Sequence, residues 1–246
     1  MTAQRIWPEF HGADLCAGML NVDSHGADDG YIFASVRTSK KKKLKLRIGI
    51  EDQILSYDLN GNGKYELFPL QFGSGRYTVT LYENVIGRQY RNIGTVSMYV
   101  QLNSPLSPFL VPNQYVNYGR DSELVTIADE LCDGMDAQSA FNAICHYVKT
   151  HFVYDYVKSI TVKPGVLPDI ETTMRKHMGI CQDLSAVAVA MLRTQGIPAK
   201  LVIGYADGQY HAWVTALVDG KTMRFDPTAA LMAISKPSTY TTERVY

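Results

Sequence analysis

The feature that most constrains the fold is a change in hydrophobic periodicity on the two sides of a proline-rich stretch. Before this stretch, in segments such as residues 44–50 and 77–81, apolar side chains stand at every second position. A period of two is typical of a strand with one buried and one solvated face. After the stretch, residues 137–150 carry apolar side chains at the spacing of a helix face. The two halves therefore predict two domains of different structural class.

The N-terminal half is predicted to be all-β. Turn signals rich in glycine separate its strand-like segments at residues 60–63, 73–75 and 84–87. Short strands with such turns between them favour a small antiparallel sandwich or barrel. We therefore expect a β-sandwich-like domain over residues 1–104, of which residues 1–25 are poorly patterned.

The C-terminal half is predicted to be an α+β domain over residues 117–246. It follows residues 105–116, which Pro105, Pro108 and Pro112 make an extended linker. Helical patterns come first, at residues 122–132, at residues 137–150 and from Asp169 onward. A polar loop is expected over residues 155–168, and strand-like segments begin at Ala199. The pattern assigns no structure after residue 230.

Composition excludes several functional classes. Lys+Arg and Asp+Glu both number 24, so the formal net charge is zero and nothing recruits nucleic acid or an anionic membrane. The cysteines are too few and too scattered for a disulfide framework, and CxxC and CxxH spacings are absent. We therefore expect no metal and no cofactor. No segment has the roughly 18 apolar residues of a membrane span, and no signal peptide is visible. The expected location is the cytoplasm, or outside the cell if a leader has been removed.

Two features of the β domain resemble binding sites. Residues 58–63 have the first half of a calcium-binding loop, but its twelfth position is Pro69 rather than glutamate, so hairpin turns explain it better. Residues 40–43, with Lys45 and Arg47, are basic and alternate with apolar side chains. They are expected on the solvated face of an edge strand, where lysine discourages aggregation. A protein or glycan partner for this domain is a conjecture that rests on its separateness.

Cys181 is a candidate nucleophile at the start of a helix. Gly179 supplies a turn before it, and Gly196 followed by Pro198 ends the apolar run that begins there. Unpaired backbone N–H groups and the helix dipole at an N-terminus favour the reactive thiolate. The same N–H groups could stabilise an oxyanion. On its own, however, a free cysteine is more often a buried, inert side chain.

A hairpin predicts the base that such a cysteine needs. If Asp219 and Gly220 form its loop, Trp213 faces Asp226 and the diagonal neighbour of Asp226 on that face is His211. Diagonal positions lie roughly 7–8 Å apart, within reach of an imidazole and a carboxylate. A four-residue loop keeps this register, whereas a three-residue loop places the two side chains on opposite faces. The hairpin thus predicts a histidine–aspartate pair.

Four blocks of the chain resemble the transglutaminase-like superfamily of cysteine acyl-transfer enzymes. These are Gly179-Ile180-Cys181, Arg193 to Pro198, His211-Ala212-Trp213 and Asp226-Pro227-Thr228, in the family's order. The resemblance extends over residues 137–230 and implies an α+β fold with the cysteine on a central helix packed against an antiparallel sheet. It also implies Cys181 as nucleophile, His211 as general base and acid, and Asp226 as the residue that orients His211.

The chain departs from the family at two points that concern substrate and rate. Many members have a tryptophan just before Asp-Pro-Thr, where this chain has residues 223–225, Met-Arg-Phe. No residue matches the family's side-chain oxyanion donor, for which the candidates are Tyr154, Tyr156 and Gln182. We place Trp213, Gln182 and Tyr205 in the substrate cleft, with the alternative that Trp213 only shields the histidine–aspartate pair.

The expected function is attack on an amide of a peptide or protein substrate, through a thioester. Hydrolysis is favoured, which would make the protein a peptidase or amidase. Transfer to a lysine amine, as in a transglutaminase, uses the same triad and stays open. The alternative from another class is a non-catalytic binding module on this fold, although a module of that kind has no reason to retain all three groups.

Overall fold

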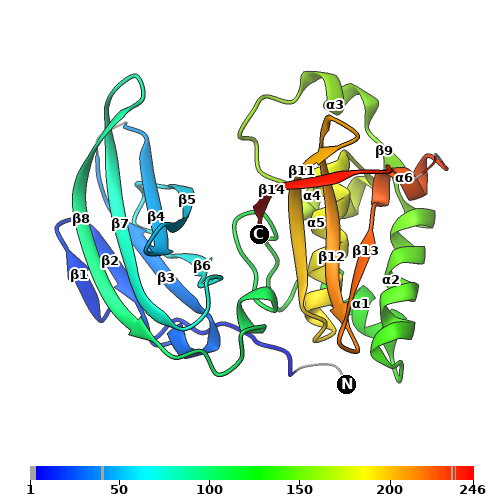
Figure 1. Ribbon diagram of the computed structural model, residues 1–246, viewed down its shortest axis with the longest axis horizontal. Coiled ribbons are helices and arrows are strands. Elements are labelled where there is room, and N and C mark those ends of the chain that lie inside the picture. The colour runs from blue at the N-terminus through cyan, green and yellow to red at the C-terminus, as the bar shows by residue number, and fades with distance from the viewer. Residues whose placement is uncertain (1–3, 40–41, 234, 236) are drawn as a thin grey trace. The chain divides into compact units, whose positions relative to one another are not determined.

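The computed structural model describes residues 4–39, 42–233, 235 and 237–246, which divide into two structural units. We call Trp7–Val111 the β unit, and Met1–Ile6 together with Pro112–Tyr246 the α+β unit. In Figure 1 the labelled elements of the β unit are all strands, and those of the α+β unit are helices and strands. Each unit is described by itself.

The β unit contains two antiparallel four-stranded sheets. The first has the order β1 (Leu15–Ala17), β2 (Leu20–Asp23), β3 (Tyr31–Val36) and β6 (Glu66–Pro69). The second has the order β5 (Gln53–Leu59), β4 (Leu44–Ile50), β7 (Gly75–Ile86) and β8 (Gln89–Val100). The sheets pack face to face, since the ring of Tyr57 on β5 meets the ring of Phe68 on β6 at 5.0 Å between centroids. This is the sandwich-like arrangement that the strand pattern predicts.

The period-two pattern of β4 correctly predicts which of its side chains are buried. Leu44, Leu46 and Ile48 on β4 are buried, and Lys45 and Arg47 between them are not. One expectation for this strand is wrong, because β4 lies between β5 and β7 and is not an edge. Lys45 is therefore flanked by strands, and its ammonium donates to Asp58 of β5 at 2.9 Å. Lys40 and Lys41 lie outside the described residues.

Two segments of the β unit differ from the expectation. The poorly patterned residues 1–25 contain β1 and β2, which are too short for alternation to be recognised. The expected linker over residues 105–116 is not extended throughout, because Ser107–Phe109 form a 3-10 helix, and Phe109, Leu110 and Val111 are buried. A further 3-10 turn covers Ala27–Asp29. Prolines in this stretch shape a packed turn rather than a free connection.

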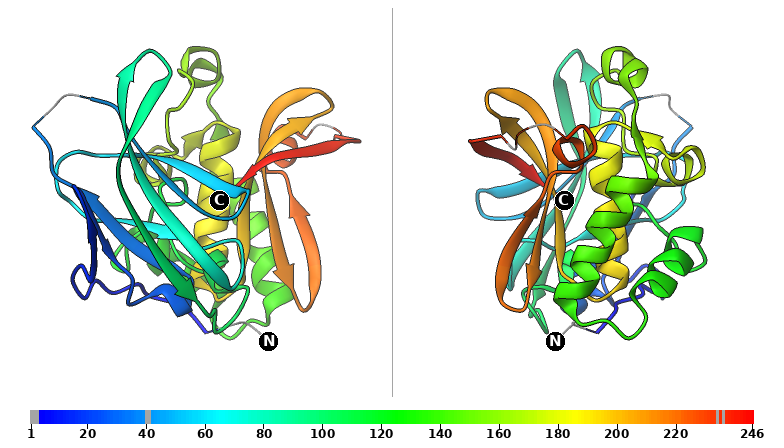
Figure 2. Two further views of the ribbon diagram at one scale, coloured as in Figure 1. Left: turned by 60° about the vertical axis from the view of Figure 1, so that its left-hand side comes forward. Right: turned by 90° about the vertical axis from the view of Figure 1, so that its right-hand side faces the viewer.

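The α+β unit has an antiparallel sheet on which one central helix packs. The sheet order is β13 (Lys221–Phe225), β12 (Gln209–Val218), β11 (Ala199–Ala206) and β14 (Tyr240–Val245). The helices are α1 (Glu123–Cys132), α2 (Ala137–His151), α3 (Tyr156–Thr161), α4 (Ile170–Lys176), α5 (Cys181–Thr194) and α6 (Pro227–Leu231). A parallel pair, β9 (Val153–Tyr154) and β10 (Met178–Gly179), joins the regions before α3 and α5. Figure 2 shows α5 in yellow, between the sheet and the other helices.

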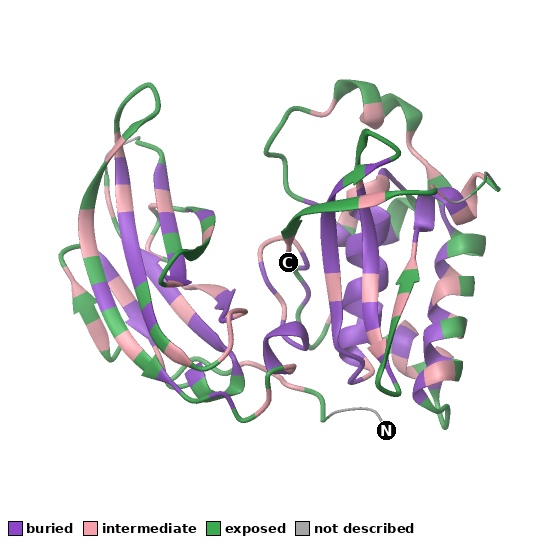
Figure 3. Ribbon diagram, in the orientation of Figure 1, coloured by how far each residue is buried: buried purple, intermediate pink, exposed green. Residues whose placement is uncertain are grey.

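The sequence of α5 explains its central place. Every residue from Asp183 to Thr194 is buried, which the small side chains of its alanines permit on all sides (Figure 3). Arg193 is buried, and it donates to the carbonyls of Ala199 and Tyr246 at 2.9 Å each, which links the helix to the sheet. Gly196 follows with a φ of 68°, a conformation that favours glycine after a helix end. The predicted limits of this helix are confirmed.

The unit also contains elements that the pattern does not predict. The loop expected over residues 155–168 holds α3, which has no buried residue and is capped by the side chain of Asp155 just before it. The last residues form β14, where most side chains are exposed and no alternation is left to recognise. Among the described residues, no helix combines the length and apolar character that a membrane span needs.

Candidate active site

Cys181 is the first residue of α5, as its neighbours dictate. Ile180 before it is extended, and the backbone N–H of Ile180 donates to the Asp183 carboxylate at 3.0 Å, which fixes where the helix begins. The preceding Gly179 pairs with Tyr154 of β9. A side chain at Gly179 would lie 2.8 Å from the Cβ of Asp183, so glycine is required for this close approach. The thiol of Cys181 is partly exposed.

The hairpin of β12 and β13 has the predicted register. Val218 pairs with Lys221 and Val214 with Phe225, and Asp219 and Gly220 between the strands both have a positive φ, as in a type I′ turn. His211 Nε2 donates to Asp226 Oδ2 at 2.9 Å. The predicted histidine–aspartate pair is therefore present. The Cys181 thiol lies close enough to the His211 ring to raise the pKa of that ring.

The Asp226 carboxylate is held by its position as well as by His211. It caps α6, where its Oδ1 accepts the backbone N–H of Ala229 at 3.1 Å, and Pro227 is the first helical residue. Its Oδ2 also accepts the hydroxyl of Tyr240 at 3.0 Å. Both oxygens of a buried carboxylate are thus hydrogen bonded, which is what a fixed orienting group needs.

Tyr240 is a site residue that the sequence analysis did not find. It lies on β14, at the opposite edge of the sheet from β13. Its ring meets the Trp213 ring at 4.9 Å, and the Arg224 guanidinium stands 4.2 Å above it. These contacts hold the hydroxyl against Asp226. No signal in the sequence singled out Tyr240, because the segment around it has no periodicity.

The charges of this cluster are coupled. Burial lowers the pKa of His211, but its hydrogen bonds to Asp226 and Cys181 raise it more, and the resulting pKa is about 9. Burial also raises the pKa of Asp226, and its bonds to His211, Ala229 and Tyr240 reverse this and lower it below its ordinary value. An imidazolium and a carboxylate are therefore the stable forms at neutral pH, and an imidazolium next to a thiol favours the thiolate.

Two cavities adjoin these residues, and both are lined by Tyr154, Cys181, Tyr210 and His211. The Asp226-side cavity, of 280 Å³, is completed by residues from β11, α6 and the segment that follows α6. The Lys163-side cavity, of 460 Å³, is completed by residues 159–166, by Gln182 and by Arg244. Cys181 thus stands where a substrate could lie on both sides of its thiol.

Of the three residues predicted to line the substrate cleft, only Gln182 lines one of these two cavities. Gln182 lines the Lys163-side cavity. Trp213 is 2% exposed, lines neither cavity and stacks beside His211, so it shields the pair and does not form the cleft. Tyr205 lines neither cavity either, and is 45% exposed on β11 with its ring against Tyr210. The expectations for Trp213 and Tyr205 as cleft residues need correction, because Trp213 is buried between His211 and Tyr240, and the ring of Tyr205 packs against Tyr210 outside both cavities.

The candidate oxyanion donors are also separated by the structure. The amide of Gln182 donates one of its two N–H groups to the Val166 carbonyl at 3.1 Å. Tyr156 is exposed on α3. Tyr154 lines both cavities, and burial raises its pKa to about 12, with a smaller contribution from Cys181. It keeps its proton at neutral pH.

A buried ion pair supports the start of α5. Asp183 is 0% exposed, and its Oδ2 accepts from the Lys158 ammonium at 2.7 Å as well as from the Ile180 N–H. Its Oδ1 has no hydrogen-bond partner among the described residues. Lys158 thereby balances a carboxylate two positions after Cys181 and ties α3 to the helix that carries the thiol.

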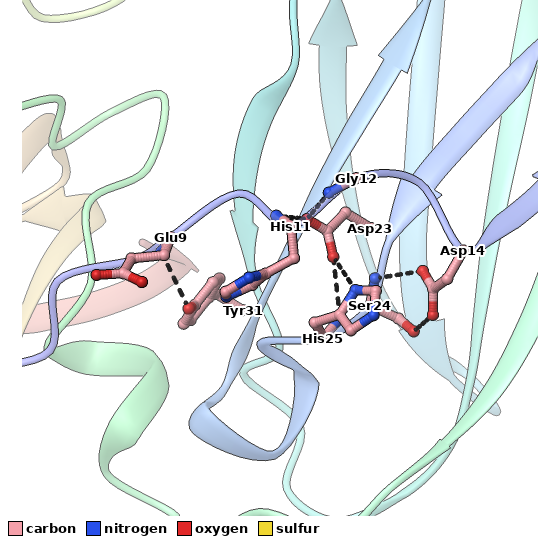
Figure 4. Close-up of polar contacts among 8 residues, drawn as sticks. All are labelled: Glu9, His11, Gly12, Asp14, Asp23, Ser24, His25 and Tyr31. Carbon is pink, nitrogen blue, oxygen red and sulfur yellow. Dashed lines mark hydrogen bonds and ion pairs between the residues drawn. The ribbon is translucent and has the colours of Figure 1, made fainter.

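Among the described residues, one group in the β unit has side chains spaced as metal ligands. The ligand atoms of Asp14, Asp23 and His25 lie within 4.8 Å of one another. Figure 4 shows, however, that Asp23 accepts from the backbone N–H groups of His11 and Gly12 and from the His25 ring. Ser24 donates its N–H and hydroxyl to the two oxygens of Asp14. Through these hydrogen bonds, the carboxylates of Asp14 and Asp23 join the segment before β1 to the end of β2. This structural role explains why the two side chains lie close together.

The segment that carries the site matches a known family. Residues 126–227, which include Cys181, His211 and Asp226, match the model of the transglutaminase-like superfamily. An uncharacterized protein of Mycobacterium leprae (strain TN) is 30% identical over 86 residues. That match covers 30% of this chain and 29% of the relative, so less than a third of the curated relative is spanned.

Solved structures are similar over more of the chain. A proposed cysteine protease from Cytophaga hutchinsonii has a TM-score of 0.44 and 15% identity, over 88% of this chain and 83% of that one. Red sea bream transglutaminase has a TM-score of 0.32 and 14% identity, over 80% of this chain and 48% of that one.

Proposed function

Because residues 126–227 form a transglutaminase-like core, we propose that this protein is a cysteine acyl-transfer enzyme that cleaves amides of peptides or proteins, with water as the favoured acceptor. The observation that supports this most is that Cys181 and His211 line both cavities, with His211 hydrogen bonded to Asp226 and its pKa raised by both neighbours. A nucleophile, its base and an orienting carboxylate are the parts that covalent acyl transfer needs.

In the proposed first step, the thiolate of Cys181 attacks the carbonyl carbon of the amide. The C–N bond of the tetrahedral intermediate then breaks, and the Nδ1 proton of His211 passes to the departing amine. A thioester on Cys181 and a neutral imidazole remain. The pKa of about 9 supports this role, because it keeps the proton on His211 until the leaving group takes it.

The oxyanion of this intermediate requires donors that are already oriented. The backbone N–H of Cys181, at the start of α5, is one candidate. We propose the hydroxyl of Tyr154 as the second, because it lines both cavities and stays protonated.

In the second step, neutral His211 takes a proton from the acceptor as the acceptor attacks the thioester. The C–S bond breaks, the acyl product leaves, and the thiolate and imidazolium are restored. If the acceptor is water the product is an acid, and if it is an amine the product is a new amide. The Asp226–His211 bond maintains the ring orientation through both steps.

The test is turnover of blocked peptide amides, with release of amine or ammonia as the readout. We expect Cys181→Ala to abolish turnover, and His211→Gln to reduce it by about 10²–10⁴-fold, the range for a general acid and base. Cys16→Ser is the matched control, because Cys16 is an exposed cysteine of the β unit. Equal turnover in wild type and Cys181→Ala would overturn the proposal.

The same assay separates hydrolysis from transfer. Added primary amine should leave the acid as the main product if water is the acceptor. A product mixture dominated by the new amide would assign the protein as an amine transferase. Limiting iodoacetamide between pH 5 and 8 offers an independent check, since an activated Cys181 should react at low pH faster than Cys16.

A further inference from the structure

We propose that the Lys163-side cavity binds an anionic group of the substrate, so that the preferred amides carry a carboxylate close to the bond that is cleaved. This rests on the proposed function and adds the class of substrate. The cavity adjoins the thiol directly, because Cys181, Gln182 and His211 form part of its wall.

Charge is the first observation. Lys163 and Arg244 line the cavity, and none of the described residues that line it is an aspartate or glutamate. The Asp226-side cavity differs, because the charged residues in its wall are the paired His211 and Asp226. The two cavities next to the thiol therefore differ in charge, because only the Lys163-side cavity has a net positive wall. Walls of one sign in a partly closed space raise the local concentration of ligands of the opposite charge.

The position of Lys163 is the second observation. It follows α3 in a tight turn, closed by a bond from the N–H of Val166 to the carbonyl of Lys163 at 3.3 Å. The Val166 carbonyl in turn accepts from the amide of Gln182, next to the thiol. This bond anchors the Lys163 turn to the start of α5. The Lys163 ammonium has no ion-pair partner among the described residues, so its charge is available to a ligand.

Arg244 lines the same cavity from strand β14. It lies on β14, paired with Ile203 of β11, which also lines the cavity. Its Nε and one terminal nitrogen donate to Glu243 Oε1 at 3.3 and 2.9 Å. Glu243 does not line the cavity, and an exposed pair of this kind contributes little to stability. A guanidinium has five N–H donors, so it retains donors for a substrate carboxylate.

The remaining wall fits an aliphatic chain that ends in a carboxylate. Val162, Val166 and Ile203 are apolar, and Tyr115 and Tyr210 present rings. An acidic side chain and a terminal carboxylate share this chemistry. The apolar surroundings lower the local dielectric and strengthen the contact between the carboxylate and the two cations.

The experiment compares three series of peptide amides that are matched in length. One has an internal glutamate near the cleaved bond and a blocked C-terminus, one has glutamine in its place, and one has glutamine with a free terminal carboxylate. We expect kcat/KM of an acidic series to exceed that of the neutral one by about 10-fold or more, the value of a charge-assisted hydrogen bond. Which acidic series is preferred identifies the source of the carboxylate. Equal kcat/KM in all three would overturn the proposal.

Charge-reversed variants link the preference to the cavity. Lys163→Glu should remove the preference for acidic amides and favour a lysine-containing series. Arg244→Gln should reduce the preference in the same direction. Lys221→Glu, on the exposed start of β13, is the control and should leave the preference intact. A preference that survives both Lys163→Glu and Arg244→Gln would overturn the proposal.

Binding separates this inference from the proposed function. Cys181→Ala is titrated calorimetrically with the same three peptides. Tighter binding of an acidic peptide without turnover by the wild type would sustain the anionic site and refute the enzyme. Turnover by the wild type with no charge preference in either measurement would refute the anionic site and leave the enzyme.

Discussion

At the scale of single residues, the charge on His211 connects structure to mechanism. Its pKa of about 9, against 6.5 for a free imidazole, depends on Asp226 and Cys181. We expect the ring resonances of His211 to titrate near pH 9 by NMR, and Asp226→Asn to move the midpoint down toward 6.5. A midpoint near 6.5 in the wild type would contradict the ion pair.

The same shift has a consequence for stability. Because the pKa of His211 is higher in the folded state, its contribution is complete below about pH 6.5 and is lost as the pH rises through about 9. The difference in free energy of unfolding between wild type and His211→Gln should therefore shrink over this interval. Urea unfolding at pH 6, 7.5 and 9.5 measures it, and a difference that grows with pH would have the wrong sign.

The proposed role of Tyr154 as an oxyanion donor can be tested by removing its hydroxyl. If its hydroxyl donates to the oxyanion, Tyr154→Phe should lower kcat by about 10²–10³-fold with little change in KM, because the bond forms only in the transition state. Tyr156→Phe is the matched control on the exposed face of α3. Equal effects of the two variants on kcat would exclude this role.

The residues that could be predicted are those whose positions follow from local rules. A two-residue turn determines register, so His211 and Asp226 follow from Asp219 and Gly220. Tyr240 could not be predicted, because it reaches Asp226 from a strand at the other edge of the sheet. The burial of Trp213 could not be predicted either, because the ring that covers it belongs to Tyr240, on the same distant strand.

At the scale of elements, α3 and α5 are linked by one buried charge pair. Lys158→Met leaves the Asp183 carboxylate buried without its cation, which should cost about 3–5 kcal/mol of unfolding free energy. It should also lower the reactivity of Cys181, since the uncompensated carboxylate then disfavours a thiolate nearby. Urea unfolding and iodoacetamide kinetics measure the two effects.

The control for that pair is Lys149→Met, on the exposed side of α2. It removes a cation of the same kind and should change the unfolding free energy by no more than about 0.5 kcal/mol. If the two variants are equally stable, the Lys158–Asp183 pair does not hold α3 against α5.

Elements could be predicted where one face is buried and the other is wet. This holds for β4, α2 and β12, whose periodicities match their burial. It fails for α3, which buries nothing, and for β1 and β2, which are too short. The proline-rich residues 105–116 show a different limit, because proline fixes the local backbone but does not say that Phe109 and Leu110 will be buried.

At the scale of the whole molecule, the division into two units predicts independent unfolding. Each unit has its own buried core, and each contains one of the two tryptophans: Trp7 in the β unit and Trp213 in the α+β unit. Tryptophan fluorescence can thus be made specific for one unit by replacing the other tryptophan with phenylalanine. The Trp213→Phe protein reports on the β unit and the Trp7→Phe protein on the α+β unit.

A core substitution in the β unit then tests the division. Leu46→Ala on β4 should lower the stability of that unit by about 2–5 kcal/mol, because it leaves a cavity in a fully buried place. In the Trp213→Phe background the urea midpoint should fall accordingly. In the Trp7→Phe background the midpoint should stay where it is, because Trp213 belongs to the other core. Midpoints that fall together in both backgrounds would mean that the two units unfold as one cooperative body.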